Sequence, residues 1–331
     1  YPQVDYVIRG DSTEEPLLQL MQCIEKKRYP EDIPNVTWRD ADKKIHVNPL
    51  TFVPESLDDF VIDAGRMVKA SLRYRDILGH LPYHEWDDYP ITSVLAYKGC
   101  NFNCVTCGGS NYSYRKICNR SSLAWIKPEK LVEEMKIIQQ YTNGPIFVLG
   151  DLRMAGKDYA ESVFRAMRKE GVDNPVILEL FTPASKDYLE KMAESVPSFN
   201  LEISPESHDE AVRYAFGRAY GNNELERTIS EALKQGCQRL DIFFMIGLPY
   251  QTKESALNTV DYCQSLLKDH GRNGRLRPFI APLAPFLDPG SIAFENPENH
   301  GYRLFFRELD KYRQAMHHPS WKYFLNYQTL W

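Results

Sequence analysis

The sequence has no apolar run near the ~20 residues that a membrane-spanning helix requires, and no signal-peptide pattern opens it. It also lacks an excess of positive charge: 40 Lys and Arg stand against 45 Asp and Glu, a formal net charge of −5. This balance argues against a broadly nucleic-acid-binding surface, so we interpret Arg272, Arg275 and Arg277 as a solvated loop. We expect neither a membrane nor a nucleic acid as partner.

Cysteine is scarce and mostly isolated. There are seven cysteines, an odd number, and three of them fall within one short stretch. This distribution does not suit a disulfide framework and favours a reducing, cytoplasmic location. A second C-x2-4-C pair, typical of zinc sites, is also missing. The remaining cysteines stand alone: Cys23, Cys118, Cys237 and Cys263.

The composition is that of an ordinary globular protein, with 43% hydrophobic and 26% charged residues. From residue 91 onward, strand-like and helix-like stretches alternate, which predicts parallel βα units and an α/β fold. Six such units are too few for a closed eight-stranded barrel. The predicted strands are Ile91–Tyr97, Ile146–Leu149, Val176–Phe181, Asn200–Ile203, Leu240–Ile246 and Pro278–Ala281. The predicted helices are Pro128–Tyr141, Asp158–Lys169, Ser185–Glu194, Asn223–Gln235 and Lys253–Lys268.

The first predicted strand runs into a cysteine-rich loop. Cys100, Cys104 and Cys107 follow it at spacing C-x3-C-x2-C. Thiolates are soft ligands that suit iron–sulfur clusters and zinc. A cubane cluster has four irons, so three cysteines leave one iron open to another ligand. Two alternatives are that the cysteines pack as small apolar side chains or bind zinc.

At this loop the sequence resembles the radical S-adenosylmethionine (SAM) enzymes. The resemblance covers about residues 89–291 and implies a partial (β/α)6 TIM-like barrel, open on one side. It implies that the three cysteines hold a 4Fe–4S cluster whose open iron binds SAM. One electron, from a donor such as flavodoxin or ferredoxin, then cleaves SAM to a 5′-deoxyadenosyl radical. Thr106 departs from the family, which usually has an aromatic residue before the third cysteine.

The resemblance also implies SAM contacts where the strands end, at the C-terminal face of the barrel. Gly150 and Asp151 follow the second strand, where the family has a G-G-E-like turn at the SAM amino group. Alternatively, Asp151 only caps the next helix. Ser204 and Glu206 match ribose and methionine contacts, and Arg218 matches an arginine that clamps the SAM carboxylate. The remaining predicted cofactor contacts are Phe102, Thr106, Ile246, Gly247 and Leu248, the last three at the adenine.

We predict four regions: residues 1–48 as the tail of an N-terminal domain, 49–88 as a connecting arm, 89–291 as the barrel and 292–331 as a C-terminal extension over its open side. The opening strand, Val4 to Ile8, which we expect to be buried, and the helix after it read as the end of a βα unit. This resembles the cobalamin-binding domain found before many such barrels, so cobalamin is expected upstream of the chain, which begins at Tyr1. Val36 to Arg39 and Lys44 to Val47 are expected to form a hairpin with a polar turn. In the arm, Met67, Val68, Leu72, Ile77 and Leu78 are expected to contact the barrel.

The sequence therefore indicates a radical SAM enzyme acting on an unidentified substrate, with methyl transfer expected if cobalamin takes part. Methylthio transfer to RNA or protein is an alternative, as is a non-catalytic zinc- or cluster-binding module. Ala284 to Ser291 resembles a proline-rich turn of cobalamin-type members. Cys118 is assigned to structural burial, with a second-cluster or substrate role left open, and Cys237 and Cys263 to the core.

Overall fold

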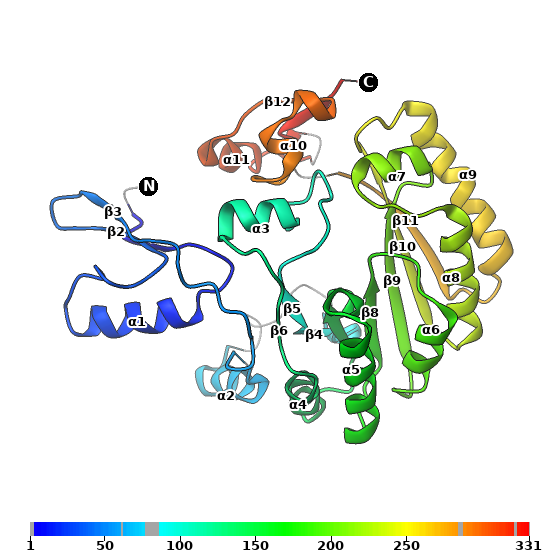
Figure 1. Cartoon of the computed structure of the whole chain (residues 1–331), viewed down its shortest axis with the longest axis horizontal. Helices are drawn as coiled ribbons and strands as arrows, with labels where there is room; N and C mark the ends of the chain where they lie inside the picture. The colour runs from blue at the N-terminus through cyan, green and yellow to red at the C-terminus, as the bar shows by residue number, and fades with distance from the viewer. Residues whose placement is uncertain (1–2, 61, 77–85, 284–286, 321–322, 331) are drawn as a thin grey trace.

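The computed structural model describes residues 3–60, 62–76, 86–283, 287–320 and 323–330 (Figure 1). Ile77, Leu78 and the start of the proline-rich turn, residues 284–286, lie outside the described residues. In the part of the chain that is described, no helix is both long and apolar enough to cross a bilayer.

A six-stranded sheet forms the centre of the fold, in the order β11-β10-β9-β8-β7-β4. Every neighbouring pair in it is parallel, which confirms the predicted βα units and the α/β class. The strands are β4 (Thr92–Leu95), β7 (Ile146–Leu149), β8 (Val176–Leu180), β9 (Phe199–Glu206), β10 (Arg239–Ile246) and β11 (Leu276–Pro282). The connecting helices are α4 (Pro128–Gln139), α5 (Lys157–Glu170), α6 (Lys186–Ala193), α8 (Asn222–Lys234) and α9 (Lys253–His270).

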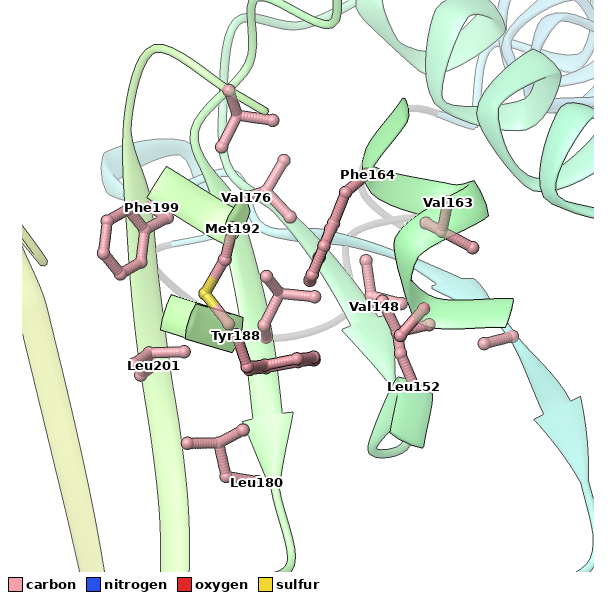
Figure 2. Close-up of a cluster of buried hydrophobic side chains, with 14 of the residues drawn as sticks. Val148, Leu152, Val163, Phe164, Val176, Leu180, Tyr188, Met192, Phe199 and Leu201 are labelled. Carbon is pink, nitrogen blue, oxygen red and sulfur yellow. The ribbon is translucent and has the colours of Figure 1, made fainter. Parts of the chain in front are cut away.

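The main core lies between the sheet and these helices. Strand residues of alternate position, such as Val148 and Leu201, are fully buried against helical side chains. Figure 2 shows Phe164 of α5 and Tyr188 and Met192 of α6 packed over β7, β8 and β9. Burying one such side chain contributes roughly 1.5–3 kcal/mol, so this layer fixes the strand ends that build the site.

The opposite face of the sheet carries the other alternate residues, and several of these are charged. Glu179, Glu202 and Asp241 are register partners on β8, β9 and β10, so they form one row across three strands. We call them the carboxylate row. Because the helices pack on the other face, this row faces the inside of the partial barrel.

The first predicted strand divides into two. After β4, residues Tyr97–Lys98 form β5, which pairs antiparallel with β6 (Ala124–Trp125) instead of continuing the sheet. The chain therefore leaves the sheet before the first cysteine. The loop then leads into α3 (Asn111–Cys118).

Strand β9 contains a β-bulge near its end. Ile203 pairs with Ile242, but Glu206 pairs with Phe244, so β9 has one more residue than β10 between these points. Glu206 has a φ of 68°, a left-handed conformation that costs an ordinary residue about 1 kcal/mol or more. Such bulges re-aim side chains at functional sites, and here the bulge turns Glu206 toward the chain after α7 (Glu210–Phe216).

The N-terminal residues form a separate small unit (Figure 1). It contains β1 (Tyr6–Ile8), α1 (Glu14–Glu25) and the predicted hairpin of β2 (Val36–Arg39) and β3 (Ile45–Val47). The opening strand is less buried than expected, with Val7 46% exposed, because β1 is an edge strand paired only to β2 within the described chain. A largely buried ion pair, Asp11 to Arg120, connects this unit to the residues that follow α3.

In the connecting arm, α2 (Ala64–Tyr74) packs against α4 through other residues than expected. Met67 and Leu72 are 56% and 64% exposed, and only Val68 is half-buried. Close packing occurs instead at Gly65, where an added Cβ would lie 2.4 Å from the hydroxyl oxygen of Tyr141. The short spacing of these helices thus depends on glycine rather than on apolar side chains.

The C-terminal residues build a second small core beside the sheet end. Its buried members are Leu287, Ala293, Phe294, Tyr302, Tyr312 and Tyr327. The elements here are α10 (Ile292–Glu295), β12 (Tyr302–Leu304), α11 (Leu309–Ala315) and β13 (Tyr327–Thr329), and short 3-10 turns occur at Trp86–Asp88, Leu152–Ala155 and Glu298–His300. In Figure 1 this region lies next to α3 at the top of the view.

Candidate cluster and cofactor site

The three cysteines lie on the loop between β5 and α3. The sulfur of Cys100 accepts the backbone N–H of Phe102 at 3.4 Å, and the sulfur of Cys107 accepts that of Gly109 at 3.3 Å. Amide hydrogen bonds to sulfur stabilise thiolates and are one means by which proteins set cluster potentials. Two of the three cysteine sulfurs thus each accept a backbone hydrogen bond from within the loop.

Side chains and neighbouring backbone fix the loop in place. The amide of Asn111 donates to the carbonyl of Cys100 at 2.9 Å, and Ser110 caps α3. The backbone N–H of Val105 donates to the carbonyl of Phe216 at 3.0 Å. At Gly217 an added Cβ would lie 2.9 Å from the carbonyl oxygen of Asn103, so only glycine permits this close approach. The loop and the end of α7 therefore pack as one body.

Burial makes these thiols hard to ionise without a metal. It raises the pKa of Cys104 to about 12 and that of Cys107 to about 11, and it also raises the pKa of Cys100. The positive charge of Arg218 opposes the shift at all three. Cationic iron would supply the missing compensation, since a coordinating thiol is deprotonated outright. The donor set fits an iron–sulfur cluster.

Within the described ranges, no three His, Cys, Asp or Glu side chains stand close enough to share a single metal ion, the cysteines included. In a cubane each cysteine binds a different iron, so the sulfurs stand further apart than the ligands of one zinc ion. The arrangement therefore gives no support to the zinc alternative.

Arg218 lies directly behind the cysteine loop. Its guanidinium lies against the rings of Phe102 and Phe181, 5.2 Å and 4.9 Å from their centroids, and the two rings themselves meet edge to face. It donates to the carbonyl of Phe181 at 2.9 Å, while one nitrogen lies 3.9 Å from Glu206. Its Nε is buried and has no hydrogen-bonding partner among the described residues. A pre-oriented arginine with an unused donor suits a carboxylate ligand.

Glu206 and two tyrosines are also left without full partners. Glu206 is 6% exposed, and burial raises its pKa to about 7, although Arg218 acts in the opposite direction. The hydroxyls of Tyr97 and Tyr220 are buried and lack hydrogen-bonding partners in the described chain. Unsatisfied buried polar groups are costly, and several of them around one point indicate a polar ligand. These orphan groups are what a SAM-sized molecule would satisfy.

The turn after β7 does not present Asp151 as the resemblance implied. The Asp151 carboxylate accepts from the side chain of Arg153 at 2.5 and 2.9 Å and from the N–H of Phe181 at 2.9 Å. It also caps the 3-10 turn that follows, which was the alternative prediction for this residue. Instead, the N–H of Gly150 donates to Glu179 at 2.9 Å. Glu179 is thus the carboxylate next to this glycine turn.

Hydrogen bonds within the protein already use part of the backbone in the turn after β10. The side chain of Gln251 accepts the N–H of Gly247 at 2.8 Å, and the hydroxyl of Tyr302 donates to the Gly247 carbonyl at 2.7 Å. Leu248 is fully buried. Ile246 is 43% exposed, so its side chain is the surface left for a planar base.

The other predicted contacts lie near the same place. Ser204 is half-buried on the face of β9 that carries Glu202. Thr106 is buried within the cysteine loop at 3% exposure, and Phe102 lies under Arg218. Cys118 is elsewhere: it is half-buried at the end of α3, and its electrostatic neighbours are Asp11 and Arg120.

A segment after β11 holds the cysteine loop from the other side. Asp288 accepts the N–H of Gly108 at 2.8 Å, and Ser113 donates to the carbonyl of Gly290 at 2.9 Å. The N–H of Ala293 donates to the carbonyl of Val105 at 2.8 Å. We call residues 287–295 the clasp. It joins the end of the last strand to the loop after the first one.

Sequence reasoning missed Glu179, Tyr97 and Phe181. Glu179 had a usable signal, because a single carboxylate stands inside the otherwise apolar strand Val176–Leu180. Tyr97 and Phe181 had none, since each ends a strand of ordinary composition.

The fold and the site define an α/β enzyme with a three-cysteine loop at the C-terminal face of a partial barrel. The family description "Radical SAM superfamily" matches residues 94–263, just over half of the sequence. The chain belongs to the radical SAM superfamily, whose enzymes use a 4Fe–4S cluster and SAM. The predicted class, fold and pair of cofactors are therefore confirmed.

Three similar proteins are informative. An uncharacterized methyltransferase, PH0819 of Pyrococcus horikoshii, is 23% identical over 82% of this chain and 55% of its own length. Cytidylyl-2-hydroxyethylphosphonate methyltransferase of Streptomyces wedmorensis is 21% identical over 75% of this chain and 49% of its own. The structure of the radical SAM methyltransferase TsrM of Kitasatospora setae, with cobalamin and a [4Fe–4S] cluster bound, gives a TM-score of 0.64 at 13% identity, covering 92% of this chain and 57% of that one. This chain spans about half the length of each.

Proposed function

We propose that this chain carries the cluster- and SAM-binding part of a radical SAM methyltransferase. The observation that carries the proposal is the contact of Arg218 with the cysteine loop: a buried arginine with an unused donor behind three clustered thiols. The methyltransfer part is supported by the names of the two relatives and of TsrM. The substrate stays unidentified, and the electron donor, flavodoxin or ferredoxin, stays a prediction.

The side chains divide into three tasks. Cys100, Cys104 and Cys107 would hold the cluster, which when bound supplies the electron that splits the sulfonium of SAM. Arg218 would bind the SAM carboxylate with its free Nε, held in direction by the two phenyl rings. The carboxylate of Glu206 accepts no hydrogen bond from any described residue and would accept the ribose hydroxyls.

The ammonium group of SAM would lie against Glu179. Asp151 is fully used by Arg153 and the Phe181 amide, whereas Glu179 is half-buried and bonded only to the Gly150 amide among the described residues. Burial raises the pKa of Glu179, and a neighbouring cation would reverse that effect. Burial raises the pKa of Tyr97, and the charges of Asp151, Cys100 and Glu179 raise it further, so this tyrosine lies near both carboxylates.

Cobalamin remains a prediction. We assign no cobalamin ligand to any described residue, and we keep the interpretation of residues 1–48 as the end of a preceding domain, 49–88 as the arm and 292–331 as the extension. The exposed apolar residues of the N-terminal unit support this interpretation. They are Val4, Val7, Leu17, Leu18, Met21, Ile24, Ile45 and Val47.

Direct binding of SAM to the cluster tests the proposal. The reduced, reconstituted protein is expected to change its electron paramagnetic resonance spectrum when SAM is added, because three cysteines leave one iron for the SAM ligand. The test uses SAM that is free of S-adenosylhomocysteine, at a saturating concentration, and methionine alone is the control. An unchanged spectrum would contradict an open iron and, with it, the proposed function.

Glu179 and Asp151 form a matched pair of substitutions. Glu179→Gln keeps an acceptor for the Gly150 amide but removes the charge, so SAM should bind about 10-fold more weakly with little loss of stability. Asp151→Ala leaves the guanidinium of Arg153 without its buried partner, so it should lower the free energy of unfolding by ~3–5 kcal/mol. Equilibrium dialysis with SAM and urea unfolding separate the two effects.

The two substitutions are expected to change different quantities: Glu179→Gln the affinity for SAM, and Asp151→Ala the stability of the fold. If Asp151→Asn, which can still accept from Arg153, lowers SAM affinity while Glu179→Gln does not, the ammonium lies at Asp151 as the family resemblance first implied.

A further inference from the structure

The carboxylate row contains more negative charge than the neighbouring arginines neutralise. Asp241 is paired with Arg239, which donates to it at 2.7 to 2.9 Å. Glu206 faces Arg218. Glu179 and Glu202 have no Lys or Arg within ion-pair distance in the described chain. On the proposed function, the ammonium of SAM neutralises Glu179, so Glu202 is the carboxylate that remains.

Glu202 is half-buried on β9 and makes no hydrogen bond to any described residue. Below it the inside of the barrel is filled. The amide of Asn200 donates to the hydroxyl of Tyr89 at 3.2 Å, and Arg239 lies over the Tyr89 ring, 5.9 Å from its centroid. Glu202 therefore faces the space above this layer, toward the strand ends where the cofactors bind. Burial raises its pKa to about 7, as do the charges of Asp241 and Glu179, while Arg239 lowers it.

A second buried polar group lies near the carboxylate row. Tyr97, on the other wall of the partial barrel, is 5% exposed, and its hydroxyl has no hydrogen-bonding partner among the described residues. Its ring packs against Gly150, where an added Cβ would lie 2.7 Å away. The hydroxyl lies close enough to Glu179 to feel its charge. The hydroxyl of Tyr97 and the carboxylate of Glu202 thus both lie near Glu179.

Apolar surface adjoins Glu202 on the same face. Phe243 follows Asp241 by two positions, so it points to the same side of β10. It stacks on its register partner Phe279 of β11, with ring centroids 5.2 Å apart and planes at 16°. Phe279 is 39% exposed. A flat apolar surface beside an unneutralised carboxylate suits a molecule that has an apolar body and a cationic end.

We propose that the substrate is an amine with an apolar or aromatic body, whose protonated nitrogen is held by Glu202 and whose body lies on Phe243 and Phe279. This inference rests on the proposed function for its place beside SAM, and it assigns the class of substrate that the function leaves open. Arg277, the register partner of Asp241 on β11, lies on the same face but is exposed and makes no ion pair with Glu179 or Glu202 among the described residues, so it does not neutralise them.

The test measures binding of phenethylamine to the full reconstituted chain with SAM present, by ligand-observed nuclear magnetic resonance at pH 8, where Glu202 is ionised. Two probes of similar size complete the set: neutral 2-phenylethanol and anionic 3-phenylpropanoate. The parent protein should bind the amine at least about 10-fold more tightly than the alcohol, because a charge-assisted hydrogen bond replaces a neutral one, and the carboxylate most weakly. A parent that binds the three probes equally overturns the proposal without any variant.

Glu202→Gln should lower the affinity for phenethylamine by about 10-fold and leave that for 2-phenylethanol unchanged. Glu254→Gln, an exposed carboxylate on α9, is the matched control and should change neither. Equal amine affinity in the parent and in Glu202→Gln overturns the proposal. The change that SAM produces in the electron paramagnetic resonance spectrum of the cluster is recorded on the same samples. Its loss in the parent would contradict the proposed function, whereas its retention with no preference for the amine contradicts only the substrate class.

Discussion

Replacing Cys100, Cys104 and Cys107 together with alanine is expected to leave a protein that takes up no cluster. The parent chain, reconstituted without oxygen, should hold about four irons and be brown, because these are the clustered soft ligands of the sequence. Iron analysis and visible absorbance measure both quantities. The effect should be complete rather than graded, since a cubane with no cysteine ligand has nothing to hold it.

The other cysteines provide the control. Cys118, Cys237 and Cys263 replaced together with alanine should retain full iron content, although burial of the last two predicts some loss of stability. If the first variant kept its iron and colour, or if the control lost them at a temperature where it is folded, the cluster would lie elsewhere in the chain.

Arg218→Ala and Glu206→Ala are expected to weaken SAM binding by roughly 10- to 150-fold each, because a charge-assisted hydrogen bond in a desolvated site contributes roughly 1.5–3 kcal/mol. Both side chains are more than nine-tenths buried, so solvent does not screen them. Iron content should stay at the parent value in both variants, since neither residue is a metal ligand. Equilibrium binding of SAM and iron analysis on the same preparation separate these two quantities.

Two further variants sharpen this test. Arg218→Lys keeps the charge but loses the planar group that contacts the rings of Phe102 and Phe181, so it should resemble alanine more than the parent. Arg227→Ala, an exposed arginine on α8, should bind SAM like the parent. Parent-like affinity in both Arg218 variants would move the SAM site away from the end of β9 and leave the cysteine loop as its main support.

Much of this architecture could be predicted because its signals are local. Six strands and five helices follow from hydrophobic periodicity, and the three cysteines lie within eight consecutive residues. Arg218 was identified through the family resemblance, which has a Gly-Arg pair after the polar end of this strand. The split of the first strand was not predicted, since Tyr97–Lys98 leaves the sheet to pair with residues 124–125, far along the chain.

The features that sequence reasoning missed depend on which of several possible partners each side chain contacts in the folded protein. Asp151 looked available, but Arg153 lies two residues away and takes both of its oxygens. Glu206 continues the alternation of Glu202 and Ser204 in the sequence, and only the bulge in β9 turns it to Arg218. The apolar pattern of β1 suggested that the strand is buried, but the exposure of its side chains depends on which elements pack beside it. None of these outcomes is contained in a local pattern.

The clasp has a consequence for the order in which the site forms during synthesis. Gly108 and its acceptor Asp288 are 180 residues apart, and Val105 receives its donor from Ala293. A ribosome that adds about 5–20 residues per second needs roughly 10–40 s to make that stretch. During this interval the cysteines are already outside the ribosome but lack the contacts that fix their loop. The growing chain therefore carries its three thiols without the clasp until the last strand of the sheet has been made, so the complete cysteine loop forms only after the whole barrel has been synthesised.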